Sequence, residues 1–363
     1  MMNNKSKNAF LNYGLVIVFF VVFQALLSTG NISSLLKGLL VPMTAYMILA
    51  ISLNLVVGIS GELSLGHAGF MSIGAFTAAF VEGVILNNIK MEGPLSKNLG
   101  VQILIFVISV IVAAVLAAIA GFLIGIPVLR LNGDYLAIVT LAFGEIIKNI
   151  FNCIYISIDE TGVHISDKNP SLDAGFAGKM ILEGPQGSVI KKVSIFAAGI
   201  ILLLLVLIIV QNLVNSKAGR AIMAMRDNRI AAESSGLPIK KYKLMAFTIS
   251  AAIAGAGGAL FALNSTGITP KQFDFNASIL ILVFVVLGGI GNMTGSMIAA
   301  ALLYILPEML RELDVQKYRM LIYAVLLIAV MLITNNEKIR ALAGRVFKKK
   351  DKASVKPEAG KEA

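Results

Sequence analysis

Long apolar stretches recur along the whole chain and limit what it can fold into. A helix needs about 20 mainly apolar residues to cross the hydrocarbon core of a bilayer. Because the stretches are continuous rather than alternating, they predict helices and not the strands of a barrel. The fold class that we expect is all-α, a polytopic membrane protein with about 8 full spans plus one or two broken or re-entrant Gly-rich helices. The stretches are Leu11–Leu27, Leu35–Val57, Gly69–Leu86, Val101–Leu129, Tyr135–Ile156, Val193–Val214, Leu244–Leu263, Ser278–Leu306 and Tyr318–Thr334.

Composition excludes an ordinary soluble domain. The chain is 57% hydrophobic and 14% charged, whereas soluble domains carry about 25% charged residues. The net charge of +11 is concentrated in Asn215–Lys243 and Asn335–Ala363, which flank apolar stretches. Basic residues in that position report membrane topology, so we expect no nucleic-acid partner. The single cysteine, Cys153, cannot form a disulfide within the chain.

The basic segments predict the orientation of the spans. Lysine and arginine in short loops favour the cytoplasmic side, which places residues 215–243 inside. Counting back through the spans puts the N-terminus inside as well, and the first stretch reads as an uncleaved span rather than a signal peptide. The chain is then expected to divide into a cytoplasmic N-terminal end with the first span, a transmembrane domain with one external and one cytoplasmic loop, and a basic cytoplasmic tail. The N-terminal end with the first span is residues 1–34, and the tail is residues 335–363. The transmembrane domain is residues 35–334, with the external loop at 157–192 and the cytoplasmic loop at 215–243.

A conflict in this count points to a broken helix. Both the segment 215–243 and the tail are basic, yet three apolar stretches, an odd number, separate them. The stretch Ser278–Leu306 contains Gly288, Gly289, Gly291 and Gly295, and glycine weakens a helix. We therefore expect Gly288–Gly295 to separate two half-helices, which returns both termini to the cytoplasmic side.

A weak internal echo suggests a second break. Leu65–Gly69 and Leu287–Gly291 share the pattern Leu-Gly-x-x-Gly, and broken segments in transporters often lie at matching places on the substrate path. Polar residues within spans are also functional candidates. We expect both breaks to line a substrate path near the middle of the membrane. The alternative is that the glycines only pack helices and that Glu145 pairs with Lys148. The candidates are Ser64, Gly66, His67, Gly69, Thr140, Glu145, Gly288, Gly291, Asn292 and Thr294.

The sequence lacks the motifs of several kinds of functional site. The chain has no G-x-x-x-x-G-K-[ST] sequence for binding phosphate, and its two histidines are far apart without a cysteine partner. Gly255–Gly258 lies inside an apolar stretch, where close helix packing explains it better than a dinucleotide site. We therefore expect no metal, no cofactor and no enzymatic activity.

The basic segment 215–243 predicts a short helical element that ends at Gly236-Leu237-Pro238. Such an element, basic on one side and apolar on the other, fits a groove on a partner. It equally fits an anchor on anionic lipid.

A resemblance bears on that choice. Ala231-Ala232-x-x-x-Gly236 resembles the E-A-A-x-x-x-G loop of ABC importer permeases, with Ile230 where many families have glutamate. In those proteins the loop grips the ATPase subunit. The residues that the resemblance and the basic loop nominate for coupling are Gly219, Arg220, Arg226, Asp227, Ala231, Ala232 and Gly236.

Further blocks carry a wider resemblance, and they are Ser52–Gly58 with Gly61–Phe70 and Ile73–Ala75, then Leu129–Leu141, then Val286–Gly291 with Leu306-Pro307-Glu308. These blocks resemble branched-chain amino acid ABC-transporter permeases, the longer of the two permease types. The resemblance implies a translocation path in the bacterial cytoplasmic membrane. Its implied partners are ABC subunits that bind ATP, a second homologous permease and an extracytoplasmic substrate-binding protein. Open alternatives are a permease for urea, short amides or nucleosides, a transporter driven by an ion gradient, and a membrane-embedded transferase.

Overall fold

The structure is a computed structural model that describes residues 13–25, 34–88, 99–131, 133–159, 162–170, 178–190, 196–309, 324–325 and 328. The chain forms two units, Met1–Tyr304 and Ile305–Ala363. The second unit is described only at the end of one helix and at residues 324, 325 and 328. The elements that position the candidate residues therefore belong to the first unit. The expected basic tail, the lysines near the N-terminus and most of Tyr318–Thr334 lie outside the described residues.

Six helices are long and apolar enough to cross a membrane. They are α2 (Ser34–Asn54), which continues into the π-helical turn η1 (Leu55–Ser60), α3 (His67–Asn88), α4 (Leu99–Val128), α5 (Asp134–Cys153), α6 (Phe196–Asn215) and α9 (Ile239–Asn264). Shorter helices are Tyr13–Ala25, α7 (Lys217–Asp227), α8 (Arg229–Ser234), α10 (Phe275–Gly288) and α11 (Met293–Met309).

The expectation of a polytopic helical membrane protein is confirmed, but the described residues supply six long spans rather than eight. Of the other two expected spans, Leu11–Leu27 is described as the shorter helix Tyr13–Ala25, and most of Tyr318–Thr334 lies outside the described residues. The stretch Ser278–Leu306, which was expected to be broken, is divided into α10 of 14 residues and α11 of 17 residues. At 1.5 Å per residue, 14 residues extend about 21 Å, less than the hydrocarbon core of about 30 Å.

The expectation of an all-helical chain needs correction within the predicted external loop. Strands β1 (Tyr155–Asp159), β2 (Gly162–Ser166) and β3 (Lys179–Glu183) form an antiparallel sheet in the order β2-β1-β3. Strand β4 (Ser188–Val189) pairs with β5 (Gly267–Ile268), and the 3-10 turns η4 (Gly184–Gln186) and η5 (Pro270–Phe273) lie beside them. Isoleucines alternate with polar residues in β1, the period of two of a strand, and the neighbouring Ser157 and Ile158 are both buried.

Helix α9 packs against α2, α3 and α4 at the centre of the unit. A Cβ at Gly255 would come within 2.8 Å of the carbonyl oxygen of Ala113, and one at Gly258 would collide with the carbonyl oxygen of Met71. Small residues let backbones approach closely where lipid provides no hydrophobic drive between helices. The packing interpretation of Gly255–Gly258 is therefore confirmed.

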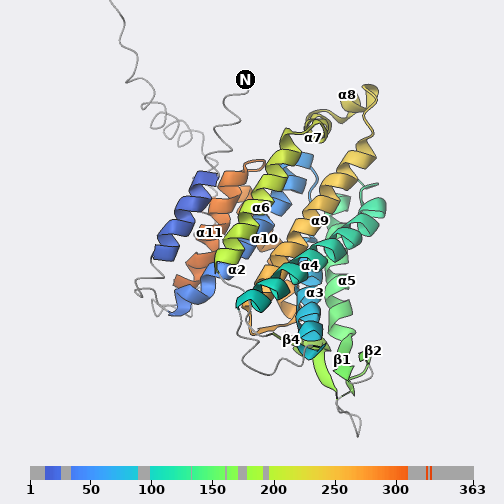
Figure 1. Ribbon diagram of the computed structural model, residues 1–363. Helices are drawn as coiled ribbons and strands as arrows, with labels where there is room; N and C mark the ends of the chain where they lie inside the picture. Colours follow the sequence, from blue (N-terminus) through green and yellow to red (C-terminus); the bar gives the residue numbers. More distant parts are fainter. Residues whose placement is uncertain are drawn as a thin grey trace, which may run out of the picture. The chain divides into compact units, whose positions relative to one another are not determined.

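Within this unit, α7 and α8 lie at one end of the long helices, and strands β1, β2 and β4 lie at the other (Figure 1). We call these the α7 end and the strand end. Helices α6 and α9 run between them, because each joins one of the short helices to the strand layer. Every functional candidate can be placed with respect to these two ends.

Candidate functional site

The segment between α6 and α9, predicted as a short helical element that ends at Gly236, folds as two short helices. The side chain of Ser216 accepts a hydrogen bond from the backbone N–H of Gly219 at 3.1 Å and caps α7. Asn228 caps α8 by accepting from the N–H of Ala231 at 3.0 Å. These caps satisfy donors that a helix start leaves free. Two polar residues thus divide one basic segment into α7 and α8.

Gly236 ends α8 in a left-handed conformation with φ 79°. Its N–H donates to the carbonyl of Glu233 at 3.0 Å, and the N–H of Leu237 donates to that of Ala232 at 3.2 Å. This pair of bonds is the Schellman motif, which glycine enters without steric cost. A Cβ at Gly236 would meet nothing within 4 Å, so conformation alone selects glycine here.

The α7–α8 segment has an inward and an outward face. Ala221, Ile222, Met225 and Ala232 are buried, whereas the Ile230 side chain is 78% exposed. Gly219 is buried in the corner between α6 and α7, where a Cβ would collide with the carbonyl of Leu213. Ile230 is therefore an apolar residue held out at the α7 end.

The two arginines of α7 bind different carbonyls. Arg220 Nη1 donates to the carbonyl oxygen of Asn215 at 3.0 Å, at the end of α6. Arg226 Nη1 donates to that of Gly58 at 2.7 Å, 168 residues away in the chain. The carboxylate of Asp227 accepts from Nε and Nη2 of Arg226 at 3.0 and 2.9 Å and orients the guanidinium. Of these two arginines, Arg226 is the one that connects α7 to the first helix break.

That first break begins at the π-helical turn η1, which is buried throughout. Gly61 follows with φ 74°, and a Cβ there would lie 2.6 Å from Cγ of Arg226. The chain then runs without helical structure until α3 starts at His67. Glu62 forms an ion pair with Lys243 of α9, and both residues are buried, 9% and 8% exposed. Side chains of α7 and α9 thus reach the residues Gly58–Glu62, which we call the Gly58–Glu62 turn.

The inner end of the first break packs on α5. The hydroxyl of Thr140 accepts from the N–H of Leu65 at 3.0 Å, and a Cβ at Gly66 would collide with the carbonyl oxygen of Thr140. A Cβ at Gly69 would lie 2.9 Å from Cα of Gly144. Gly66 and Gly69 therefore have the packing role that their alternative interpretation assigns to them.

A buried polar cluster surrounds His67. Its Nε2 lies 2.9 Å from Oγ of Ser52, which donates to the carbonyl of Ser250 at 2.6 Å. On the other side of the ring, His67 Nδ1 is buried and has no hydrogen-bond partner among the described residues, and the same holds for Oγ of Ser64. Buried polar atoms are usually bonded, so these two are available to bind water or solute.

The second break lies between α10 and α11, and the predicted interruption at Gly288–Gly295 is confirmed. Gly289 and Gly291 have φ angles of 95° and 83°. The side chain of Asn54 holds the break, because its Oδ1 accepts from the N–H of Gly291 at 2.8 Å and its Nδ2 donates to Oγ of Ser296 at 3.0 Å. Asn292 caps α11 by accepting from the N–H of Gly295 at 3.3 Å.

The second break meets the first at Gly58, ahead of Leu65–Gly69, where the sequence suggested the first break. A Cβ at Gly58 would lie 2.7 Å from Cα of Gly291, and one at Gly291 would lie 3.8 Å from Nη1 of Arg226. Since Arg226 belongs to α7, the second break and the start of the first lie at the α7 end. The sequence echo is also misleading, because Leu65-Gly66 precedes a helix whereas Leu287-Gly288 ends one.

Glu145 does not belong to this cluster. Its carboxylate pairs with Lys148, as the alternative interpretation expected, and accepts from the N–H of Phe275 at 3.0 Å. Phe275 opens α10 directly after η5, toward the strand end. Thr294 lies in the first turn of α11, and its side chain is half-buried. Of the ten sequence candidates, Glu145 therefore lies toward the strand end, and the others lie in or against the two breaks.

Four residues that hold the two helix breaks were not among the sequence candidates. Asn54 and Ser296 hold the second break, and Glu62 and Lys243 hold the first. Each is a polar residue inside or beside an apolar stretch, which is a usable signal. In the sequence, Lys243 served only as evidence for membrane orientation, because nothing there pairs it with Glu62, which lies 181 positions away.

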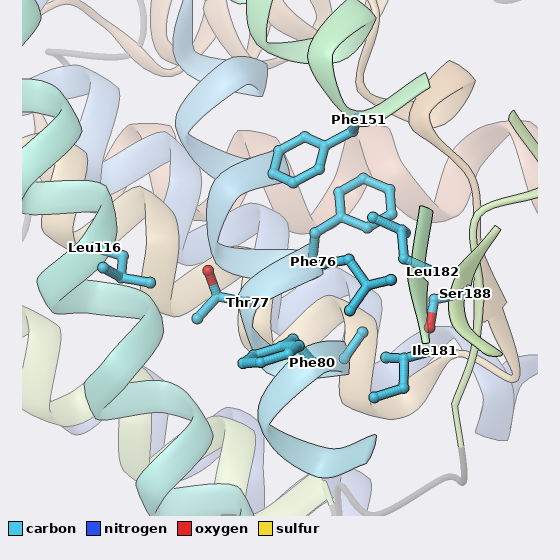
Figure 2. A pocket seen from close by; sticks show the side chains of 10 residues that line it. Phe76, Thr77, Phe80, Leu116, Phe151, Ile181, Leu182 and Ser188 are labelled. Atoms are coloured by element: carbon cyan, nitrogen blue, oxygen red, sulfur yellow. The ribbon is translucent and has the colours of Figure 1, made fainter. Parts of the chain in front are cut away.

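The strand end contains a different feature, an apolar cavity of about 150 Å³ (Figure 2). Rings of Phe76, Phe80 and Phe151 face it together with aliphatic side chains of β3. None of its ten lining residues is charged, and only Thr77 and Ser188 carry polar side chains, so it offers no charged partner for the carboxylate or ammonium of an amino acid. The lining residues are Phe76, Thr77, Ala79, Phe80, Leu116, Phe151, Ile156, Ile181, Leu182 and Ser188.

Comparisons with known proteins place this geometry in context. The family model described as "Branched-chain amino acid transport system / permease component" matches residues 35–331. High-affinity branched-chain amino acid transport system permease protein LivM of Escherichia coli (strain K12) is 35% identical over 299 residues, 79% of this chain and 66% of that protein.

Two other relatives are similar. LivM of Salmonella typhimurium (strain LT2) is also 35% identical, over the same shares of both chains. A probable LivM of Methanocaldococcus jannaschii is 27% identical over 240 residues, 66% of this chain and 65% of that protein. The chain thus spans just under two thirds of the length of these relatives. No solved structure matches the chain.

Proposed function

The chain belongs to the branched-chain amino acid transport permease family, and from that membership we propose that it is the transmembrane permease subunit of an ABC importer. On this proposal it forms the path by which branched-chain amino acids cross the bacterial cytoplasmic membrane. The family match over residues 35–331 carries the proposal. Separate ABC subunits bind and hydrolyse ATP, an external binding protein delivers substrate, and a second homologous permease completes the pore. The chain itself has no catalytic role.

The α7–α8 segment is the proposed contact with the ATPase subunit. Its support is the exposed Ile230 on α8, a short helix that is held to the rest of the chain by the buried Ala232. An apolar side chain on a small helix suits a groove on a protein partner, the helix-in-groove mode. The basic residues of the same segment favour the cytoplasmic side, where ATP is available.

The two helix breaks are the proposed cytoplasmic part of the substrate path. Backbone groups without helical bonds are tolerated at membrane depth only where they face protein or a polar cavity. Ser64 and His67 carry the buried polar atoms that have no partner among the described residues, so we assign them to substrate contact. Gly288, Gly291, Asn292 and Thr294 form the opposite wall of this region. Thr140 supports the region from α5, on which Gly66 and Gly69 pack.

Reconstitution tests the proposed function. The chain is purified with its candidate ATPase, permease and binding-protein partners, and the complex is placed in proteoliposomes. Leucine uptake should require internal ATP and the external binding protein. Liposomes that contain the same partners without this chain are the control, and they should take up no leucine.

Other results would redirect the assignment. Uptake driven by an ion gradient in the absence of ATP would indicate a secondary transporter. ATP-dependent uptake of urea, short amides or nucleosides, with no uptake of leucine, would support an ABC importer with a different substrate. A complex that never binds an ATPase subunit would contradict the proposal.

A further inference from the structure

The Arg226 side chain is 38% exposed, but its guanidinium is bound within the chain. Three of its donors are used within the chain, one by the carbonyl of Gly58 at 2.7 Å and two by Asp227. Ile230, four residues later, is 78% exposed. The α7–α8 segment therefore presents one residue outward and anchors another inward.

The carbonyl that Arg226 binds belongs to a backbone that differs from a regular helix. Gly58 lies in the π-helical turn η1, and the left-handed Gly61 follows. Single π-helical turns are rare and often occur at functional sites. Lys243 of α9 holds the other side of the same turn through Glu62. The Gly58–Glu62 turn is thus a short, irregular element bound by side chains from both sides of α8.

The turn also contacts the second break. Gly58 and Gly291 pack backbone against backbone, and Asn54, one residue before η1, accepts from the N–H of Gly291 at 2.8 Å. A displacement of the Gly58 carbonyl therefore acts on both breaks together. Arg226 is the residue through which α7 reaches that carbonyl.

We infer that Arg226 is a positioning residue that carries movement of the α7–α8 segment to the Gly58–Glu62 turn and the second break, and so opens the cytoplasmic part of the path. The inference rests on the proposed function. It assigns Arg226 a task inside the chain and leaves contact with the ATPase subunit to the outward face around Ile230. Coupling would then pass through one charged hydrogen bond to a backbone carbonyl, which is stronger than a neutral one.

The test compares Arg226→Met with Lys217→Met in reconstituted complexes. Methionine keeps the aliphatic stem that packs against Gly61 and removes every donor. Uptake of leucine per assembled complex should fall about tenfold or more, because hydrogen bonds of charged groups are among the stronger ones. Co-purification of the ATPase subunit and its ATP hydrolysis should stay within about twofold of wild type, the range of a surface substitution. Lys217, an exposed residue at the other end of α7, is the control, because its replacement removes the same charge at a position far from Gly58.

The conservative variant separates a positioning role from a structural one. Arg226→Lys keeps one donor but lacks the fork that binds Gly58 and Asp227 together, so its uptake should lie between those of wild type and Arg226→Met. If Arg226→Met yields no complex, Arg226→Lys decides: uptake below wild type supports the inference, and equal uptake overturns it.

Further outcomes are equally decisive. Normal uptake by assembled Arg226→Met would overturn the inference, and so would release of the ATPase subunit, because release would make Arg226 a docking residue. Ile230→Asp should release the subunit while Arg226→Met retains it. Failure of the proposed function looks different, since the wild-type complex would then import no leucine or bind no ATPase subunit.

Discussion

The two helix breaks share a sequence signal and differ in how they are held. The first, from the π-helical turn η1 to Gly66, is largely buried and bound by side chains from α5, α7 and α9. The second, from Gly289 to Asn292, is exposed over Ile290–Asn292 and shaped by glycines with φ angles of 95° and 83°. At Gly66 glycine serves close packing, whereas in the second break it serves an unusual backbone conformation.

This difference predicts that substitutions in the first break mainly impair assembly of the protein, and that substitutions in the second break mainly impair its movement during transport. Packing glycines of the first break should affect folding when replaced, because neighbouring backbone cannot yield. Conformational glycines of the second break should affect function at a smaller cost in stability. Four substitutions test the comparison, ordered by expected effect.

Gly66→Leu should have the largest effect. A Cβ at Gly66 would collide with the carbonyl of Thr140, so α3 and α5 must separate. We expect a loss above about 4 kcal/mol, the range of exceptional core changes, and little folded protein in membranes. Abundance and thermal unfolding in detergent measure this. Normal abundance with blocked uptake would instead place Gly66 on the open path and remove the contrast between the breaks.

Lys243→Met should destabilise the first break by about 3–5 kcal/mol, because it leaves the buried Glu62 without its partner. Adding Glu62→Leu should recover most of that loss, since an apolar pair can replace a buried ion pair. Thermal unfolding of both variants gives the comparison. Lys241→Met, an exposed lysine two residues earlier in α9, is the control and should change little. Equal effects at both lysines would show that burial of the pair does not matter.

Gly291→Leu should cost about 1–3 kcal/mol of backbone strain, since φ is 83° and the nearest neighbour of a Cβ lies at 3.5 Å. The complex should assemble, and leucine uptake should fall because the second break loses its turn. Gly291→Asn, which tolerates a left-handed conformation, should be milder. Co-purification and uptake are measured side by side. Loss of assembly would make both breaks packing elements.

Asn292→Ala should have the smallest effect, about 1 kcal/mol, the typical loss of a helix cap. Asn292 accepts from the N–H of Gly295 and is itself exposed. If capping is its whole role, Asn292→Ser should restore stability and the KM for leucine should not change. A raised KM in both variants would assign Asn292 to substrate contact, as its sequence position suggested.

The sequence alone determined the environment and the local structure. Continuous apolar stretches require helices in lipid, because only a helix pairs every backbone group locally. The glycines of Gly288–Gly295 predicted the interruption between α10 and α11, and Gly236-Leu237-Pro238 predicted the end of α8. Each of these depends on residues within one or two turns of each other, where side-chain chemistry acts directly on the backbone.

Tertiary structure decided which of those local features meet. The bond from Arg226 to Gly58 joins residues 168 apart, and the bond from Gly291 to Asn54 joins residues 237 apart. The strands beyond α5 and the ion pair of Glu62 with Lys243 likewise depend on packing. Hydropathy averages over a window and carries no record of which helix faces which. The sequence therefore indicated two breaks and a coupling segment as separate features, and only the packing of α2, α7, α9 and α10 brought them to one place.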